Sequence, residues 1–186
     1  MKVTVAKEAG FCFGVKRATE FVERSLGGDA DIYVLGNLIH NRPYNERLAA
    51  RGVRVISVAD AEAVAAQGRK ACIVIRTHGV PREDEEKLRA LEAQYPNLRV
   101  EDMTCPFVKK IHRIAAENTA PDTTLAILGD PTHPEVLSIC SYAKGDVVVF
   151  GSEESLDACL QTEKSPEKPI VLVAQTTQNT ALWKMY

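Results

Sequence analysis

Two cysteines in this sequence occupy positions where a thiol could do chemistry. Cys12 lies between Gly10 and Gly14, at a point where a short apolar stretch gives way to a helical pattern. The glycines allow the backbone to turn sharply, and the free N–H groups at a helix start favour the thiolate form of a cysteine. A thiolate can ligate a metal or attack an electrophile, although a lone cysteine is as often a buried core residue.

The second cysteine repeats the arrangement of the first. Cys105 follows a strand pattern at 98–100 and precedes Pro106, which suits the first position of a helix. An offset of 93 residues separates three pairs of landmarks: Cys12 and Cys105, Gly36 and Gly129, and His40 and His133. One offset shared by three pairs indicates an internal duplication. Each copy offers a cysteine at one strand end and a histidine at the next.

The overall composition narrows the class of protein. The chain has 186 residues, a formal net charge of −2, 45% hydrophobic residues and 26% charged residues, as is usual for globular proteins. Nothing in it predicts nucleic-acid or membrane binding, and it shows neither a membrane-spanning apolar run nor a signal-peptide pattern. Five cysteines without a CxxC pair favour a cytoplasmic protein whose thiols act individually.

Strand and helix patterns alternate along the whole chain. Strands are predicted at 3–6, 32–35, 53–56, 71–76, 98–100, 124–128, 146–150 and 169–174, with helical patterns between them. This alternation predicts an α/β fold with parallel sheets flanked by helices, and ligands gather at the carboxyl ends of parallel strands. We place the boundary between two modules near residue 98, giving a first module over 1–97 and a second over 98–186.

The polar residues expected at these strand ends form one candidate set: Cys12, His40, His78, Cys105, His133, Glu135, Thr176 and Thr177. All lie in turns that open helices, where side chains and N–H groups can converge on an anion. The remaining cysteines, Cys72, Cys140 and Cys159, lie in apolar patterns, and we interpret them as core residues. His112 is interpreted as a packing residue, or as one that supports a ligand from behind, rather than as a ligand itself.

Five motifs then carry a resemblance to a known family: Gly10–Val15, Thr77–Val80, Thr104–Lys109, His133–Val136 and Gln175–Thr177. Their types and order resemble those of the bacterial 4-hydroxy-3-methylbut-2-enyl diphosphate reductases, the LytB family, over nearly all of this chain. The resemblance implies a fold of three similar α/β lobes in a pseudo-threefold, trefoil-like arrangement around a 4Fe–4S cluster. This chain would contain two of the three lobes.

The resemblance also implies an activity in the non-mevalonate isoprenoid pathway. The family reductively dehydroxylates 4-hydroxy-3-methylbut-2-enyl diphosphate, a small allylic diphosphate, to isopentenyl and dimethylallyl diphosphates. It takes its electrons from an external donor such as ferredoxin or flavodoxin.

Each candidate residue receives a role from the same resemblance. Cys12 and Cys105 match two of the three cluster ligands, and Glu135 matches the acid that delivers a proton. The residues that match the family's substrate-binding positions are His40, His78, His133, Thr176 and Thr177.

Two departures from the family pattern bear on these expectations. The stretch Leu137–Ser141 stands where the family usually has glycines. This difference bears on how that helix packs, but not on the role of Glu135 as the acid. The sequence ends at Tyr186, just inside a new helical pattern, whereas a third cysteine is expected about 93 residues beyond Cys105, near position 198. We therefore expect a truncated product that lacks the third module and is weakly active or inactive.

Two other functions compete with the reductase. Two cysteines and three histidines could bind zinc in a non-catalytic zinc- or anion-binding α/β protein, although the usual close-spaced ligand pairs are missing. A generic phosphate-binding domain is the other alternative, but the chain has no G-x-x-x-x-G-K pattern. The colour of the purified protein separates the first alternative from the reductase, since iron–sulfur proteins are brown and zinc proteins are colourless.

Overall fold

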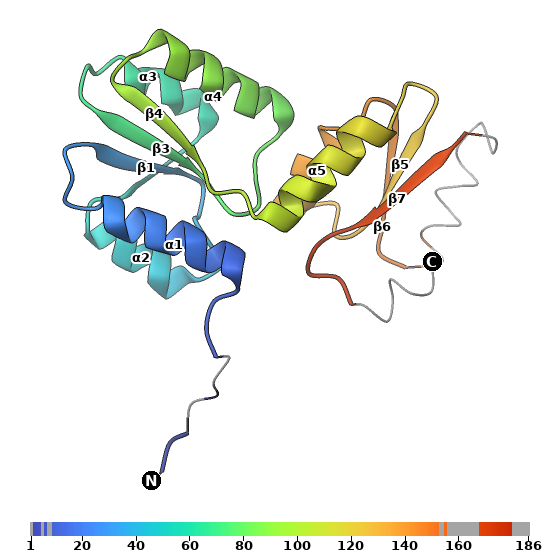
Figure 1. Ribbon diagram of the computed structural model, residues 1–186, viewed down its shortest axis with the longest axis horizontal. Coiled ribbons are helices and arrows are strands. Elements are labelled where there is room, and N and C mark those ends of the chain that lie inside the picture. The colour runs from blue at the N-terminus through green and yellow to red at the C-terminus, as the bar shows by residue number, and fades with distance from the viewer. Residues whose placement is uncertain (1, 5, 7–8, 153–154, 156–167, 180–186) are drawn as a thin grey trace. The chain divides into compact units, whose positions relative to one another are not determined.

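The structure is a computed structural model of the chain, and it describes residues 2–4, 6, 9–152, 155 and 168–179 (Figure 1). The chain divides into two compact units. Unit 1 comprises Met1–Thr77 and Tyr95–Met103, and unit 2 comprises His78–Gln94 and Thr104–Tyr186. Every helix in the described part of the chain is too short or too polar to span a bilayer.

Unit 1 is built on a four-stranded parallel sheet with the strand order β2-β1-β3-β4. The strands are β1 (Asp31–Leu35), β2 (Arg54–Ile56), β3 (Ala71–Ile75) and β4 (Leu98–Asp102). β3 is buried at all of its positions, as expected of a continuously apolar strand in the middle of a parallel sheet. The helices of this unit are α1 (Phe13–Ser25), α2 (Arg42–Ala50), η1 (Val58–Asp60) and α3 (Ala61–Ala65).

The core of unit 1 forms where α1 and α2 cover one face of this sheet. Ala18 and Val22 of α1 and Leu48 of α2 pack with alternate residues of β1 and β3, such as Val34 and Val74. All of these side chains are at most 2% exposed. The period of 3.6 in the helices and of 2 in the strands therefore brings apolar residues to the same layer.

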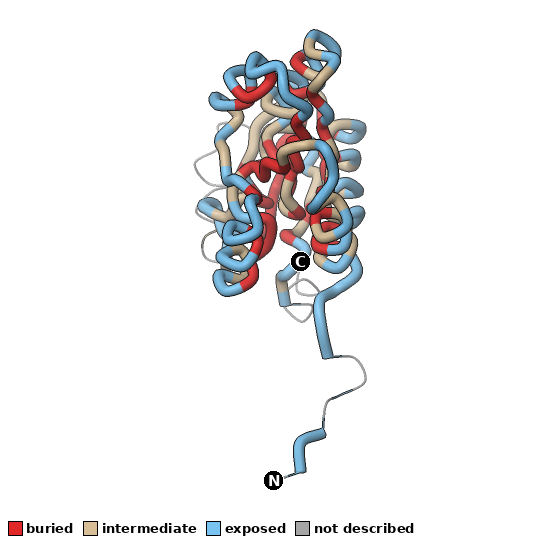
Figure 2. Tube along the Cα trace, turned by 90° about the vertical axis from the view of Figure 1, so that its left-hand side faces the viewer, coloured by how far each residue is buried: buried red, intermediate tan, exposed pale blue. Residues whose placement is uncertain are grey.

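Unit 2 contains a three-stranded parallel sheet with the order β6-β5-β7. Its strands are β5 (Thr124–Leu128), β6 (Asp146–Phe150) and β7 (Ile170–Ala174), and its helices are α4 (Arg82–Gln94), α5 (Pro106–Asn118) and α6 (Pro134–Cys140). Residues of α5, α6, β5 and β7 make one core: Ala115, Leu125, Ile127, Val136, Ile139 and Val173. Figure 2 shows the buried residues concentrated along strands and inner helix faces.

The two units repeat one arrangement, as the 93-residue offset indicates. The bounds of α1 and α5 differ by 93 residues at both ends, and so do those of β1 and β5. The order β2-β1-β3 of the first sheet corresponds to β6-β5-β7 of the second. The predicted α/β fold with parallel sheets is therefore confirmed.

Two details differ from the sequence-based expectations. Residues 2–4 and 6 form no strand, and Val3 is 72% exposed. A strand needs a neighbouring strand as a hydrogen-bond partner, and none of the described strands pairs with these residues. β4 pairs with β3, so this strand completes the first sheet instead of opening the second module. The division into modules at 1–97 and 98–186 stays a prediction.

Gly145, the residue before β6, allows a test of the packing described for unit 2. A Cβ atom on Gly145 would lie 2.2 Å from the Thr123 carbonyl oxygen and 2.3 Å from that of Ala120. Backbone atoms cannot yield as a flexible side chain can, so we expect Gly145→Ala to lower the free energy of unfolding by about 3 kcal/mol. A Cβ atom on Gly151 would meet nothing within 4 Å, so Gly151→Ala should stay within about 0.5 kcal/mol of wild type. Urea denaturation measures both; equal effects would contradict the packing described.

Candidate functional site

His78 lies on a tight turn between β3 and α4. The next residue, Gly79, has a φ of +76°, which L side chains rarely adopt. A Cβ atom there would lie 2.9 Å from His112 Cε1 and 2.9 Å from Ser138 Oγ. The glycine thus lets the backbone beside His78 pack directly against residues of α5 and α6.

His133 caps the start of α6 and is held by the turn that precedes it. The Asp130 carboxylate accepts hydrogen bonds from the N–H and the hydroxyl of Thr132, at 2.8 and 2.7 Å, and these bonds hold the pKa of Asp130 below its usual value. The Nδ1 atom of His133 accepts a 3.1 Å hydrogen bond from the Glu135 N–H. Because Nδ1 is the acceptor, the neutral His133 ring carries its proton on Nε2.

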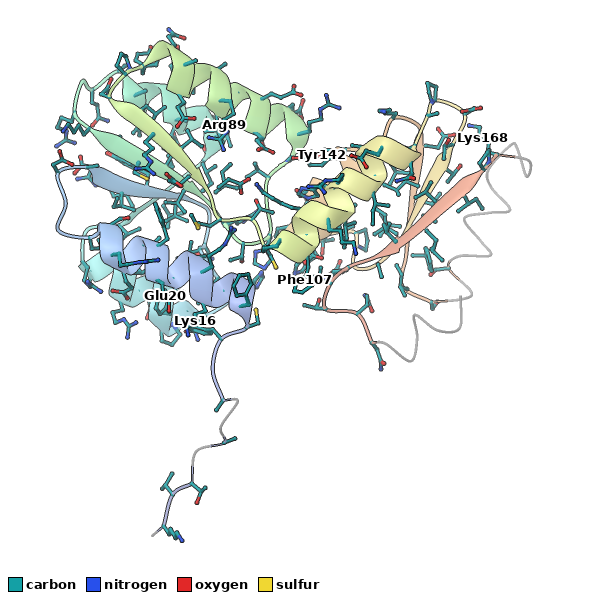
Figure 3. All side chains as sticks on the ribbon, viewed as in Figure 1. Lys16, Glu20, Arg89, Phe107, Tyr142 and Lys168 are labelled. Carbon is teal, nitrogen blue, oxygen red and sulfur yellow. The ribbon has the colours of Figure 1, made fainter. Side chains whose placement is uncertain are left out.

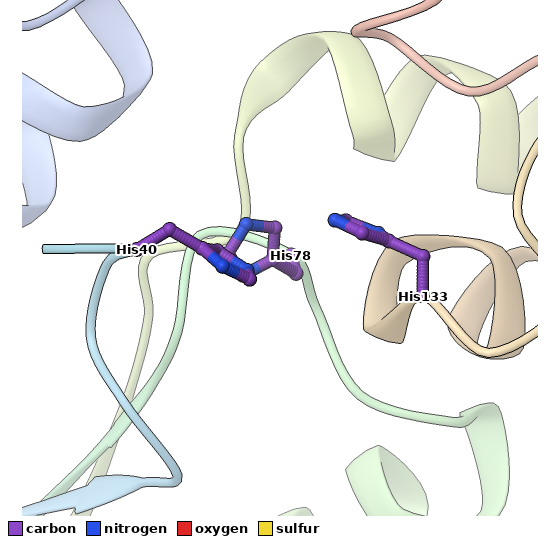
Figure 4. A group of neighbouring side chains, drawn as sticks. All are labelled: His40, His78 and His133. Atoms are coloured by element: carbon purple, nitrogen blue, oxygen red, sulfur yellow. The ribbon is translucent and has the colours of Figure 1, made fainter.

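The imidazole rings of His78 and His133 lie close together within unit 2, the edge of one ring toward the other (Figure 4). Their centroids are 5.4 Å apart and their planes are nearly perpendicular, at 84°. Each ring offers a nitrogen atom, and the two nitrogens lie within 4.8 Å of each other. This spacing suits two groups that bind one anion or one metal ion.

Glu135, two residues after His133, carries a buried carboxylate. It is 2% exposed, and both of its oxygens accept hydrogen bonds from Thr176. The Thr176 N–H lies 2.6 Å from Oε1, and the Thr176 hydroxyl lies 2.9 Å from Oε2. Because Thr176 lies two residues after the end of β7, these bonds join the start of α6 to the carboxyl end of the sheet.

Thr177, the other threonine of the predicted pair, has different partners. Its hydroxyl accepts a 3.0 Å hydrogen bond from the Gln175 side-chain amide. The Gln175 oxygen in turn accepts the Asp130 N–H at 3.1 Å. Thr176 is therefore the threonine that contacts the acid, while Gln175 ties the end of β7 to the turn before His133. Sequence reasoning gave Gln175 a place in a motif but no such role.

His40 lies in unit 1, on the loop between β1 and α2, and is exposed. Its loop is held by Asn45, whose side-chain amide donates to the Ile39 carbonyl at 2.8 Å. Asn41 caps α2 by accepting the Tyr44 N–H at 3.0 Å. His40 thus stands at the carboxyl end of a parallel strand, as its position in the sequence predicts.

Cys12 and Cys105 occupy corresponding places in the two units. Each is the N-cap residue of the helix that follows it, α1 for Cys12 and α5 for Cys105, and neither side chain makes a capping hydrogen bond. Cys12 is exposed and Cys105 is half-buried, and both are free thiols. The predicted strand-end and helix-start setting is found for Cys105, whereas no described strand precedes Cys12.

The two cysteines belong to different units, and so do His40 and the facing histidine pair. The convergence of Cys12 and Cys105 on one cluster, and of all three histidines on one anion, therefore stays a prediction.

The remaining cysteines in the described residues behave as core residues. Cys72 is 5% exposed in β3. Cys140 packs against the core of unit 2, and burial raises the pKa of its thiol, which keeps it neutral and unreactive. Cys159 lies outside the described residues. His112 is 7% exposed and stacks on Tyr142, in agreement with its interpretation as a packing residue.

Three basic residues near the cysteines, Lys16, Lys109 and Lys110, lie on solvated helix faces. Lys16 forms a 3.8 Å ion pair with Glu20, one turn further along α1 (Figure 3), and Lys109 and Lys110 of α5 are exposed. Phe107, in the first turn of α5, is 66% exposed.

Comparison with known proteins gives consistent matches. A family model described as LytB protein matches residues 3–185. A 4-hydroxy-3-methylbut-2-enyl diphosphate reductase of Geobacter sp. (strain M21) is 41% identical over 180 residues, which cover 96% of this chain and 58% of the relative. The reductase of Alkaliphilus oremlandii is 34% identical over 98% of this chain and 61% of the relative.

Two solved structures share the fold. A structure of (E)-4-hydroxy-3-methyl-but-2-enyl diphosphate reductase matches with a TM-score of 0.73 and 34% identity, covering 98% of this chain and 61% of that one. The reductase of Plasmodium falciparum matches with a TM-score of 0.79 and 24% identity, over 96% of this chain and 52% of that one. The chain thus spans about three-fifths of the length of the curated relatives it matches.

The two adjacent threonines provide a matched pair of variants. Thr176→Val keeps the shape of the side chain and the backbone bond but removes the hydroxyl that donates to the buried Glu135 carboxylate. We expect a loss of about 1.5–3 kcal/mol in the free energy of unfolding, since hydrogen bonds to charged groups have this strength. Thr177→Val removes a bond between neutral groups and should cost about 1 kcal/mol or less. A larger loss for Thr177→Val, measured by urea denaturation at neutral pH, would contradict the assigned contacts.

Proposed function

The chain belongs to the LytB protein family, and from that premise we propose that it acts in a 4-hydroxy-3-methylbut-2-enyl diphosphate reductase. The proposed reaction adds two electrons and two protons to the allylic alcohol, breaks its C–O bond, and releases water. Isopentenyl and dimethylallyl diphosphates are the products. The observation that carries this proposal is a buried carboxylate, Glu135, placed two residues after one of two facing histidines.

In this proposal His78 and His133 bind the substrate through its oxygen atoms. Because Nδ1 of His133 accepts the Glu135 N–H, the proton of the neutral ring is on Nε2, the atom proposed to donate to the substrate. An oxyanion accepts such donors strongly, and more strongly when a ring is protonated. His40 would contribute a third donor, as the family resemblance implies.

Glu135 is proposed as the acid that protonates the departing oxygen. A carboxylic acid in this role gives up its proton during C–O cleavage and is left as a carboxylate. The N–H and the hydroxyl of Thr176 both donate to that carboxylate, so the charge left by proton transfer is stabilised within a buried site. The same two bonds keep the carboxyl group from rotating away.

Cys12 and Cys105 are the residues proposed to hold a 4Fe–4S cluster. Both are free thiols at helix N-caps whose side chains make no capping bond, and thiolates are the usual ligands of such clusters. The donor set therefore fits the group. When bound, the cluster supplies electrons and a Lewis-acidic iron for cleavage of the C–O bond.

The proposal also specifies partners and location. The substrate is a small allylic diphosphate, and the electrons come from an external carrier such as ferredoxin or flavodoxin. A cytoplasmic location suits thiols that must stay reduced.

The cluster assignment can be tested with cysteine variants. Protein reconstituted anaerobically with iron and sulfide should be brown and contain iron and sulfide together. We expect Cys12→Ser and Cys105→Ser each to lose at least half of the iron, because each removes one thiolate. Cys72→Ala, which alters a buried core thiol, should retain the wild-type iron content. A colourless protein that binds zinc in place of iron would favour the non-catalytic alternative.

The role of Glu135 can be tested separately under conditions in which wild type turns over. Glu135→Gln has the same shape but no acidic proton, so kcat should fall by about 10²–10⁴-fold while the iron content stays unchanged. Glu117→Gln alters an exposed glutamate of α5 and should leave kcat unchanged. Near-normal turnover of Glu135→Gln would remove this residue from the mechanism.

A further inference from the structure

We propose that Ser138, together with His112 behind it, is a positioning residue that sets the spacing between His78 and His133. The inference rests on the proposed function, because it concerns how the same two histidines are held for an oxyanion. Ser138 lies on α6 and has no exposed surface (0%). Its hydroxyl contacts two segments that are distant in sequence.

The protons of this contact can be assigned from the chemistry of the groups. Ser138 Oγ lies 2.8 Å from the Val80 carbonyl oxygen and 2.9 Å from His112 Nε2. A carbonyl can only accept, so the single hydroxyl proton goes to Val80. The hydroxyl oxygen then accepts from His112, which must carry a proton on Nε2. Ser138 is therefore satisfied in both directions within a buried site.

The hydrogen bond from Ser138 to the Val80 carbonyl links the two segments that carry His78 and His133. Val80 is two residues after His78 on the same turn, and Ser138 is five residues after His133 on α6. A direct hydrogen bond between them ties the turn to the helix, and the separation of the two rings depends on that tie. Loss of the Ser138 hydroxyl should therefore let the two rings move apart, even though both histidines are still present.

Ser141 makes a second tie one turn further along. Its hydroxyl donates to the Ser138 carbonyl at 2.6 Å and accepts the N–H of Arg82, the first residue of α4, at 2.8 Å. The N–H of Arg82 would otherwise lack a partner within the helix. A glycine at either position could make neither bond, because it has no side-chain hydroxyl.

His112 is itself held firmly, so that it can serve as an anchor. Its ring stacks on Tyr142 at a centroid distance of 4.2 Å and an angle of 13°. The Tyr142 hydroxyl donates to the Glu85 carboxylate on α4 at 2.7 Å. Gly79 leaves no room for the turn to shift toward His112 or Ser138, since a Cβ atom there would lie 2.9 Å from each.

The test compares two buried hydroxyl groups of unit 2. Ser138→Ala removes both bonds at the turn. Thr119→Ala is the matched control, because Thr119 is 3% exposed, donates to the Ala115 carbonyl at 2.7 Å and accepts the Lys144 N–H at 2.9 Å. Both variants should lose stability, but only Ser138 joins the segments of the histidine pair. The readout is the nuclear Overhauser effect between ring protons of His78 and His133, which needs neither ligand nor cluster.

We expect the effect between the two rings to be lost in Ser138→Ala and kept in Thr119→Ala. Inorganic diphosphate should also bind Ser138→Ala about ten-fold more weakly, the equivalent of one ordinary hydrogen bond, and bind Thr119→Ala as wild type. Retention of the ring contact in Ser138→Ala, or its loss in both variants, would overturn the inference. Failure of wild type to bind diphosphate would count against the proposed function instead, since the ring contact is measured without it.

Variants of His112 give a second test that does not require Ser138→Ala to fold. His112→Gln keeps a donor that can reach Ser138, so the ring contact should survive. His112→Phe keeps the stacking on Tyr142 but has no donor, and the ring contact should weaken or disappear. Equal behaviour of these two variants would show that packing alone, without the hydrogen bond, sets the turn.

Discussion

The hydrogen bonds between the Glu135 carboxylate and Thr176 hold the candidate site together. They connect the first turn of α6 to the turn that follows β7, and they satisfy a carboxylate that is only 2% exposed. An unpaired carboxylate at this depth would be costly. With this contact made, α6 has a defined place at the carboxyl end of its sheet, and His133 at its N-cap has one orientation and one tautomer.

Parallel strand order is what allows such a contact to form. In each unit all strands of the sheet run parallel, so their carboxyl ends lie at the same edge of that sheet. The loops after β1 and β3 therefore leave one edge of the first sheet, and those after β5 and β7 leave one edge of the second. In unit 2 this brings the Asp130 turn, His133, Glu135 and Thr176 together. In unit 1, the turn after β1 carries His40, at the position that corresponds to His133. One topology, used twice, thus accounts for the corresponding positions of His40 and His133.

Sequence patterns predicted those features that depend on local chemistry. The bounds of α5 follow from Pro106 at its start and from its apolar periodicity, and the buried strand β5 follows from a continuous apolar run. The pattern at 3–6 has strand propensity, but a strand also needs a partner, and the described ladders provide none. The distinction between Thr176 and Thr177, and the role of Ser138, depend on contacts with residues 41 and 58 positions away, which no local pattern contains.

His78 and His133 are proposed to form an oxyanion site beside a buried acid. The most direct measurement is a titration of the protein with inorganic diphosphate, followed by NMR through the Cε1–H resonances of its four histidines. We expect the resonances of His78 and His133 to shift together along one binding curve, while the resonance of buried His112 shifts far less. Resonances of His78 and His133 that stay unmoved at saturating diphosphate, or that follow separate binding curves, would contradict it.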